Sequence, residues 1–426
     1  MKSAKRSGRQ THWKEYSGAS AQRLRRWNFE LHDKRQHQQA NREIRMDRVI
    51  KAVNGSSAFD FPTIDLSHDP QIGRVTRMQY WADFLRRYYF VGRKDHGPYG
   101  TPKCVERTKS IEARVLAQSR EYGDAPTLPV PEVSMKDLTP ENFHKIYLEP
   151  NTPVVFRGAA KDWEAVKKWT PEFFAEHYGD VKVATRVRGT ELNEKALQYI
   201  DLPLSEVVEN IRNGGSYYPG HTEDLFNKHP ELRNELDLDT LGKYLSTRDK
   251  RIMSTQLFLS AGGVISGWHC TGGPNLFTMV NGVKKWTFVH PKHSMWMHPI
   301  TRKDMFYAAT MLDWRKSHDE IEADGYPLYR YIPKYTTTLE AGDVLFSPHW
   351  WWHCVETPVP SIAIASRAIN KLVMGNKMFS LMWITSPRFR QTVMTVLKDG
   401  WGSDKATGAK LAFEFDTEEF VRRVSR

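Results

Sequence analysis

The stretch Gly267–Trp286, GWHCTGGPNLFTMVNGVKKW, decides the fold. His269 lies in a β-prone run that a Gly-Gly-Pro turn ends, and Asn275 begins the next run. Asn281-Gly282 is a strong signal for a β-hairpin turn, so Lys284 is expected on the returning strand. This stretch therefore predicts two strands that carry polar side chains at defined positions.

A second stretch, Gly342–Arg367, reads GDVLFSPHWWWHCVETPVPSIAIASR and places His353 in a strand after three tryptophans. The surrounding segment, Arg251–Ala368, is a succession of short β-prone runs divided by Gly, Pro and Asp. Such a pattern favours an antiparallel barrel or a double-sheet jelly roll. His269 and His353, 84 residues apart, could meet across the mouth of such a barrel. Neutral imidazoles are good ligands for Fe(II).

These motifs resemble the jumonji-C/cupin-like family of Fe(II)- and 2-oxoglutarate-dependent oxygenases over roughly residues 136–370. The matching positions are the entry segment PNTPVVFRGAAKDW, His269, Asn275 six residues on, Gly282, Lys284 fifteen residues on, and His353. The resemblance implies an α+β fold with a double-stranded β-helix (cupin/jelly-roll) barrel and helical extensions at both ends.

The resemblance also implies roles for single residues. Fe(II) would bind His269 and His353, and Lys284, not Lys285, would bind the distal carboxylate of the co-substrate 2-oxoglutarate. Further co-substrate-binding positions are Asn275, Ser266 (three residues before His269, where a hydroxyl often helps bind the same carboxylate) and Arg367, which could add to the anion site.

The sequence departs from the family pattern at Thr271, where an acid is expected two residues after His269. Two histidines and one carboxylate form the usual facial triad, and a threonine hydroxyl is a poor substitute for that carboxylate. Three outcomes are open: Thr271 leaves a position for water or an anion, another carboxylate reaches the metal, or the site holds no metal.

Neighbouring side chains offer no obvious replacement. Glu356 is three residues from His353, and side chains alternate along a strand, so an odd offset points Glu356 away from the histidine face. The same parity places Cys270 and Cys354 on the opposite face, where ordinary buried cysteines are expected.

Three functions remain open. The first is a dioxygenase that hydroxylates a protein side chain or a small molecule. The second, motivated by Thr271, is a catalytically inactive cupin-fold binding or scaffold protein. The third is nucleic-acid binding through the basic N-terminal arm, which holds 14 Lys/Arg against 5 Asp/Glu in residues 1–51, a net +9 of the chain's +12.

Composition and the positions of prolines predict how the 426 residues divide into regions. Residues 1–20 are expected to be a disordered basic tail, 21–125 a helical N-terminal region, 136–370 the cupin-like domain and 371–426 a helical region that could form a homodimer surface. Pro126, Pro129 and Pro131 mark an extended linker before the domain.

The cellular compartment is predicted from the sequence features that the chain lacks. No long apolar run suggests a transmembrane helix or secretory signal, and three cysteines argue against a disulfide framework. We expect a soluble intracellular protein, cytoplasmic or nuclear if eukaryotic, with an acidic partner or nucleic acid as candidates for the basic arm and no membrane partner.

Overall fold

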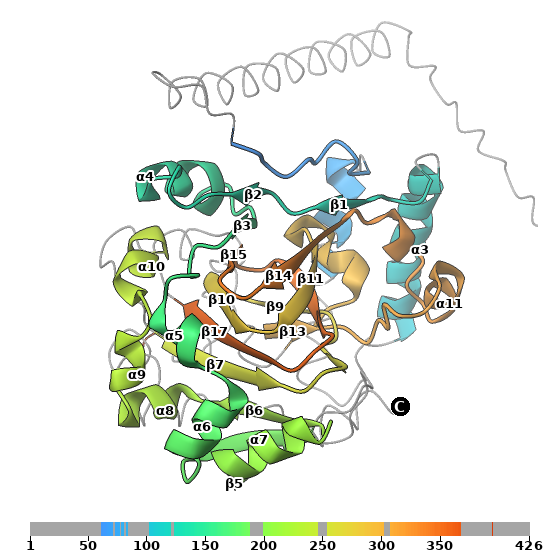
Figure 1. The fold of residues 1–426 in the computed structure, drawn as a ribbon. Coiled ribbons are helices and arrows are strands. Elements are labelled where there is room, and N and C mark those ends of the chain that lie inside the picture. The colour runs from blue at the N-terminus through green and yellow to red at the C-terminus, as the bar shows by residue number, and fades with distance from the viewer. Residues whose placement is uncertain are drawn as a thin grey trace, which may run out of the picture. The chain divides into compact units, whose positions relative to one another are not determined.

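A computed structural model of the chain describes residues 61–70, 73–76, 78–80, 82–83, 102–120, 123–187, 199–245, 254–301, 307–367 and 394. The chain divides into two units, Met1–Phe61 and Pro62–Arg426, and the helices and strands named here belong to the second unit (Figure 1). The predicted basic tail at 1–20 and the helical region at 371–426, with its homodimer surface, lie outside the described residues apart from Met394, and stay predictions.

Two mixed β-sheets carry the part of the fold that matters for function. The larger sheet has the order β1 (Thr127–Pro129), β14 (Lys334–Glu340), β11 (Val283–Val289), β16 (Trp352–Thr357), β9 (His269–Thr271), β13 (Tyr307–Ala309) and β12 (Ile300–Thr301), with β8 (Val264–Ile265) also paired to β16. The smaller sheet has the order β2 (Glu132–Val133), β3 (Val154–Phe156), β15 (Val344–Ser347), β10 (Asn275–Asn281), β17 (Ser361–Arg367) and β7 (Ser254–Ser260).

A third sheet and the helices lie around these two. The sheet has the order β5 (Tyr199–Pro203), β4 (Lys182–Val187) and β6 (Tyr217–His221). The described helices are α3 (Pro102–Ser119), α4 (Pro140–Phe143), η2 (His144–Leu148), α5 (Glu164–Lys168), α6 (Pro171–Tyr178), α7 (Leu204–Arg212), α8 (Glu223–Lys228), α9 (Glu231–Asn234), α10 (Leu238–Leu245), η3 (Pro291–Met297), α11 (His318–Ala323) and η4 (Tyr329–Tyr331). None of the described helices is long and apolar enough to cross a membrane.

The two main sheets face each other across an apolar interior. Alternate residues of β11 point into it, so Trp286 and Phe288 are buried there, while Lys285 between them is exposed. The same cluster contains Phe277 of β10 and Ala365 of β17, which belong to the other sheet. One continuous core built from both sheets is what a jelly-roll arrangement requires. Closure of the two sheets into a barrel stays a prediction.

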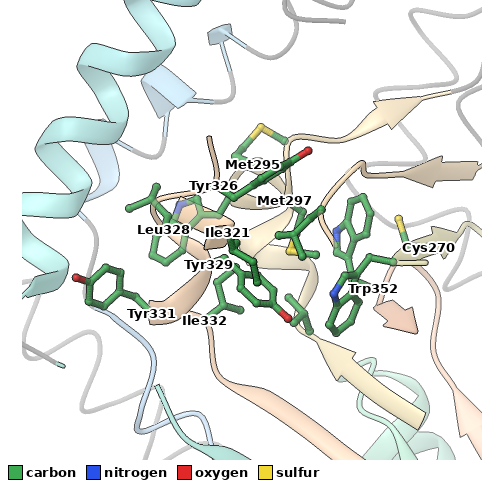
Figure 2. Packing of buried hydrophobic residues seen from close by; sticks show 14 of the residues in the cluster. Cys270, Met295, Met297, Ile321, Tyr326, Leu328, Tyr329, Tyr331, Ile332 and Trp352 are labelled. Carbon is green, nitrogen blue, oxygen red and sulfur yellow. The ribbon is translucent and has the colours of Figure 1, made fainter. Parts of the chain in front are cut away.

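Both outer faces of the sheets are covered. On the smaller sheet, Leu257 and Ile364 pack against residues of α6 and α7 such as Phe174. On the larger sheet, Cys270 and Trp352 pack against η3, α11 and η4, whose contacting side chains include Met297, Ile321 and Tyr329 (Figure 2). Any site between the sheets is therefore lined by strand residues of a single parity.

The proline-rich segment before the domain differs from the linker expected of it. β1 pairs in parallel with β14, and β2 pairs in parallel with β3, so the segment adds an edge strand to each sheet. Edge strands tolerate proline because the missing N–H can lie on the unpaired side.

The predicted hairpin at Asn281-Gly282 is wrong. β10 and β11 belong to different sheets, so the turn carries the chain from one sheet to the other. Gly282 has a φ of 80°, and a Cβ added there would lie 2.3 Å from the carbonyl oxygen of Pro360. The turn chemistry was therefore correct, but the pairing that it implied was not.

Gly282→Ala should destabilise the fold more than Gly263→Ala. Both glycines have a φ of 80°, but no atom lies within 4 Å of a Cβ built at Gly263. Gly263→Ala should cost about 1–2 kcal/mol for the left-handed backbone, and Gly282→Ala about 1–3 kcal/mol more for the overlap. Chemical denaturation measures both, and equal losses would show that the approach to Pro360 relaxes freely.

Candidate functional site

The two predicted metal-ligand histidines are direct neighbours. His269 on β9 and His353 on β16 are register partners of antiparallel strands, and their ring centroids are 4.2 Å apart at an interplanar angle of 60°. They meet side by side within one sheet, so the prediction that they would meet across a barrel mouth is wrong in this respect. Adjacent placement fixes their separation through backbone pairing alone.

The backbone sets the tautomer of both imidazoles. Nδ1 of His269 lies 2.9 Å from the carbonyl oxygen of Gly267, and Nδ1 of His353 lies 2.9 Å from that of Trp351. A carbonyl oxygen only accepts, so each Nδ1 carries a proton, and Nε2 is the ring nitrogen of each histidine that could bind a metal. Burial lowers the pKa of His353 to about 4, against the opposing effect of the Trp351 carbonyl, and the charge of Arg367 lowers it further.

Thr271 occupies the position of the missing acid. It lies two residues after His269 on β9, and hence on the same face. Among the residues that the structure describes, no group of three or more His, Cys, Asp and Glu side chains could hold a metal ion. The pair of imidazoles fits a nitrogen-liganded metal such as Fe(II), whereas the described residues supply no carboxylate to complete a facial triad.

Glu356, Cys270 and Cys354 lie on the face of the larger sheet away from the histidines, as the alternation of side chains predicts. Glu356 forms an ion pair with Lys285, with Oε1 3.0 Å from Nζ, on the face of the sheet away from His353. Cys270 and Cys354 are buried among the apolar residues of the outer face, and Figure 2 shows Cys270 there beside Trp352. Burial raises the pKa of both thiols. These cysteines are apolar core residues and contribute nothing to the histidine site.

Lys284 is buried between the two sheets with 4% of its surface exposed. Its ammonium group donates to Ser260 Oγ at 3.1 Å and to Thr357 Oγ1 at 2.8 Å. Ser260 ends β7 of the smaller sheet and Thr357 ends β16 of the larger one. Lys284 therefore bridges the two sheets at one end of the interior. Its partner Thr357 lies four residues after His353 on β16.

Asn275 and Arg367 lie at the other end of the interior. They are register partners on β10 and β17, and Arg367 donates from Nη1 to Gln256 Oε1 at 2.8 Å. The amide oxygen of Asn275 is buried and accepts no hydrogen bond from the described residues. Arg367 is close enough for its charge to act on His353. The structure thus places Asn275 beside Arg367, at the end of β10 away from the Asn281-Gly282 turn that leads to Lys284.

Ser266 has a structural contact of its own. Its hydroxyl oxygen accepts from the backbone N–H of Val355 at 2.8 Å, and its backbone N–H donates to the carbonyl oxygen of Val355 at 2.8 Å. Val355 lies between His353 and Thr357 on β16. Ser266 therefore ties the segment before β9 to β16, and its hydroxyl proton is still available to a ligand.

Sequence reasoning missed several residues that line the interior. Trp286 stacks on His353, with ring centroids 5.2 Å apart at 30°, and Phe277 packs on Trp286 at 4.9 Å. Ser260 and Thr357 hold Lys284, and Gln256 holds Arg367. Thr357 could have been found from its even offset of four from His353, but β7 carries no motif that points to Ser260 or Gln256.

The loop before His353 positions that residue. Trp350 has a φ of 65°, a left-handed conformation that costs a non-glycine residue about 1–2 kcal/mol. Its backbone N–H donates to the carbonyl oxygen of Thr271 at 2.7 Å, and the indole of Trp351 donates to the carbonyl oxygen of Asn151 at 2.6 Å. Asn151 in turn donates to the carbonyl oxygen of His349 at 3.0 Å. These bonds hold the strained loop against β9 and hence His353 beside His269.

The same loop should make the fold sensitive to acid. Burial lowers the pKa of His349 to about 4, so the unfolded chain binds a proton there below about pH 6.5 while the folded chain stays neutral. Stability is lost as the pH falls from about 6.5 towards 4, and His349 should account for about 2 kcal/mol by pH 5. Wild type should therefore lose about 2 kcal/mol more than His349→Gln between pH 7.5 and 5.

Urea denaturation at the two pH values measures this difference. His318→Gln is the matched control, because His318 on α11 is 34% exposed and contacts Asp124 at the surface. An equal acid sensitivity of wild type and His349→Gln would contradict the assignment of the neutral state to His349.

Comparisons with known proteins agree with this geometry. The family model described as a cupin-like domain matches residues 140–370, which is 231 of the 426 residues. The chain belongs to the cupin-like domain family. This family assignment confirms the resemblance stated from the sequence, and two of the curated relatives, from Drosophila melanogaster and Dictyostelium discoideum, are named as jumonji-C domain-containing proteins.

Among the relatives is the human bifunctional peptidase and (3S)-lysyl hydroxylase JMJD7, 24% identical over 54% of this chain and 81% of its own length. Lysine-specific demethylase 8 of Xenopus tropicalis is 23% identical over 50% of this chain and 47% of its own length. The mouse tRNA wybutosine-synthesizing protein 5 is 22% identical over 54% and 74%. The chain thus spans about half of the demethylase and most of the other two.

Proposed function

We propose that this chain is an Fe(II)- and 2-oxoglutarate-dependent oxygenase that hydroxylates a protein side chain or a small molecule. The observation that carries the proposal is the adjacent pair of imidazoles, His269 and His353, each with its Nδ1 held by a backbone carbonyl. Second bonds of this kind orient metal-ligating histidines and raise their basicity. Relatives named as a hydroxylase and a demethylase support the oxidative chemistry.

The residues of the chain have distinct tasks in this proposal. His269 and His353 hold the metal, and Thr271 lines the position beside them. Lys284 pairs with the distal carboxylate of 2-oxoglutarate, while Ser260 and Thr357 orient its ammonium group. When bound, Fe(II) with 2-oxoglutarate and dioxygen supplies the oxidation of a substrate C–H bond, with succinate and carbon dioxide as co-products.

The apolar lining serves the same chemistry. Trp286 and Phe288 pack against His353, and Phe277 packs against Trp286, so these rings keep water from the buried side of His353. Exclusion of water strengthens the pairing of Lys284 with a carboxylate, because the local dielectric constant is low.

The decisive measurement is succinate production from 2-oxoglutarate by the purified protein with Fe(II) under air. Wild type should produce succinate slowly even without its substrate, and His353→Ala should reduce the rate to the background. His318→Ala, which removes a surface imidazole from α11, should leave the rate unchanged. Equal succinate production by wild type and His353→Ala would contradict the two-histidine site.

A second function, a cupin-fold binding protein without catalysis, is favoured by one observation. Thr271 supplies no charge at the third ligand position, and no other described carboxylate reaches it. In that case the interior would bind a ligand but catalyse no oxidation. Binding of an acidic partner or nucleic acid by the basic arm at residues 1–51 is a further proposal. It is supported by the charge of that sequence alone, because the arm lies outside the described residues.

Restoring the acid separates these two functions. Thr271→Asp should raise the affinity for Fe(II) or Co(II) about tenfold or more, because a carboxylate adds a negative ligand beside two neutral ones. Thr338→Asp, on the exposed side of β14, is the matched control and should leave metal affinity unchanged. Calorimetric titration measures both, and unaltered affinity in Thr271→Asp would show that position 271 does not face the metal.

A further inference from the structure

Residues 62–70, here called the strap, form neither helix nor strand and are drawn in blue in Figure 1. Two buried tyrosines hold the backbone of the strap. Tyr147 donates its hydroxyl to the carbonyl oxygen of Pro62 at 2.7 Å, and Tyr335 donates to that of Asp65 at 2.9 Å. Between these two bonds, Ile64 packs against the apolar interior of the two main sheets. The first half of the strap is therefore attached by main-chain oxygens and one apolar side chain.

A buried carboxylate anchors the far end of the strap. Asp69 is 6% exposed, forms an ion pair with Lys292 of η3 and accepts from Nε2 of His293 at 2.8 Å. In contrast, residues 62, 63 and 65–68 are exposed. A segment that is anchored at a few points and exposed between them can open locally while the rest of the domain stays folded.

The contacts of the strap continue to His353 along two routes. The first runs through Tyr335, whose ring packs against that of Trp351 with centroids 5.8 Å apart at 70°. The carbonyl oxygen of Trp351 accepts from Nδ1 of His353 at 2.9 Å. Tyr335 therefore binds the strap with its hydroxyl and supports, with its ring, the residue that orients the imidazole.

The second route runs through η3. The two residues of η3 that hold Asp69 are followed by Ser294, whose hydroxyl oxygen accepts from the indole N–H of Trp352 at 2.9 Å. Trp352 directly precedes His353 on β16. Both routes thus end on the two residues before His353, so contiguous packed side chains couple the position of the strap to that of the imidazole.

We propose that the strap is a conformational switch that sets the metal affinity of the histidine pair. With the strap seated, Trp351 and Trp352 are supported from two sides, and the imidazole of His353 is held beside that of His269. When the strap lifts, these supports weaken and metal binding must restore the order that was lost, which lowers the affinity. This inference rests on the proposed function, since it takes the two histidines as metal ligands.

The coupling must also act in the opposite direction, because linkage between two sites is reciprocal. A bound metal fixes His353 and therefore favours the seated strap by the same factor by which the strap favours the metal. Loss of the metal loosens residues 62–70 and releases Ile64 from the interior. The surface of the protein thus differs between its metal-loaded and metal-free forms.

The test is calorimetric titration of the full-length protein with Co(II). Ile64→Asp should unseat the strap, because a carboxylate is costly to bury against an apolar interior, and should lower the affinity for Co(II) about tenfold or more. Leu66→Asp is the matched control: it places the same charge in the same strap, at a side chain that is 42% exposed. Its affinity should equal that of wild type. Asp69→Ala releases the other end of the strap and should also lower the affinity.

Hydrogen exchange of the wild type keeps the test decisive if a variant does not fold. The backbone amides of residues 63–69 should exchange about tenfold more slowly with saturating Co(II) than in EDTA, since the metal favours the seated strap. The amides of α7, on the outer face of the smaller sheet, are the internal control and should exchange at the same rate under both conditions.

The outcomes separate the switch from the proposed function. Equal Co(II) affinity of wild type and Ile64→Asp, or equal exchange of the strap with and without Co(II), would overturn the switch and leave the oxygenase proposal intact. Loss of affinity in Asp69→Ala alone would show that η3 acts on His353 without the strap, and would also overturn the switch. Absence of Co(II) binding by wild type would overturn both proposals. Strap-dependent Co(II) affinity without succinate production would support the switch and favour the binding protein.

Discussion

The antiparallel register of β9 and β16 is the constraint on which the site depends. It places His269 directly opposite His353, and the alternation of side chains then decides which neighbours share their face. Thr271 and Thr357 are on that face because their offsets from the histidines are even. Glu356 is excluded because its offset is odd, and its ion pair with Lys285 lies on the other side of the sheet. A slip of one residue in this register would exchange the two sets.

The charge distribution inside the sheets is unusual for a site meant to hold a cation. Among the described inward positions of the strands, the side chains that carry a full charge are those of Lys284 and Arg367. A bound dianion would neutralise both charges and add negative ligand atoms beside the imidazoles.

The sequence allowed the strand content and the orientation of Glu356 to be predicted, because each follows from local parity or motif spacing. The choice of Lys284 over Lys285 as the residue that binds the co-substrate stays a prediction. It misled at Asn281-Gly282, where turn chemistry fixes a chain reversal but leaves open which strands pair. The position of Arg367 along the strands relative to Lys284 could not be predicted either. That position depends on the pairing of β17 with β7, two strands that are about one hundred residues apart and share no recognisable motif.

The imidazole pair owes its geometry to the backbone, and this explains how the site has its shape without a carboxylate at position 271. Both Nδ1 atoms are held by carbonyl oxygens of their own strands, and the loop before His353 is fastened to Thr271 through its backbone oxygen, which any residue supplies. Thr271 therefore supports the loop as well as an acidic residue would, although it brings no charge to the site. Such a site can change its ligand chemistry through one side chain while the fold that presents it stays the same.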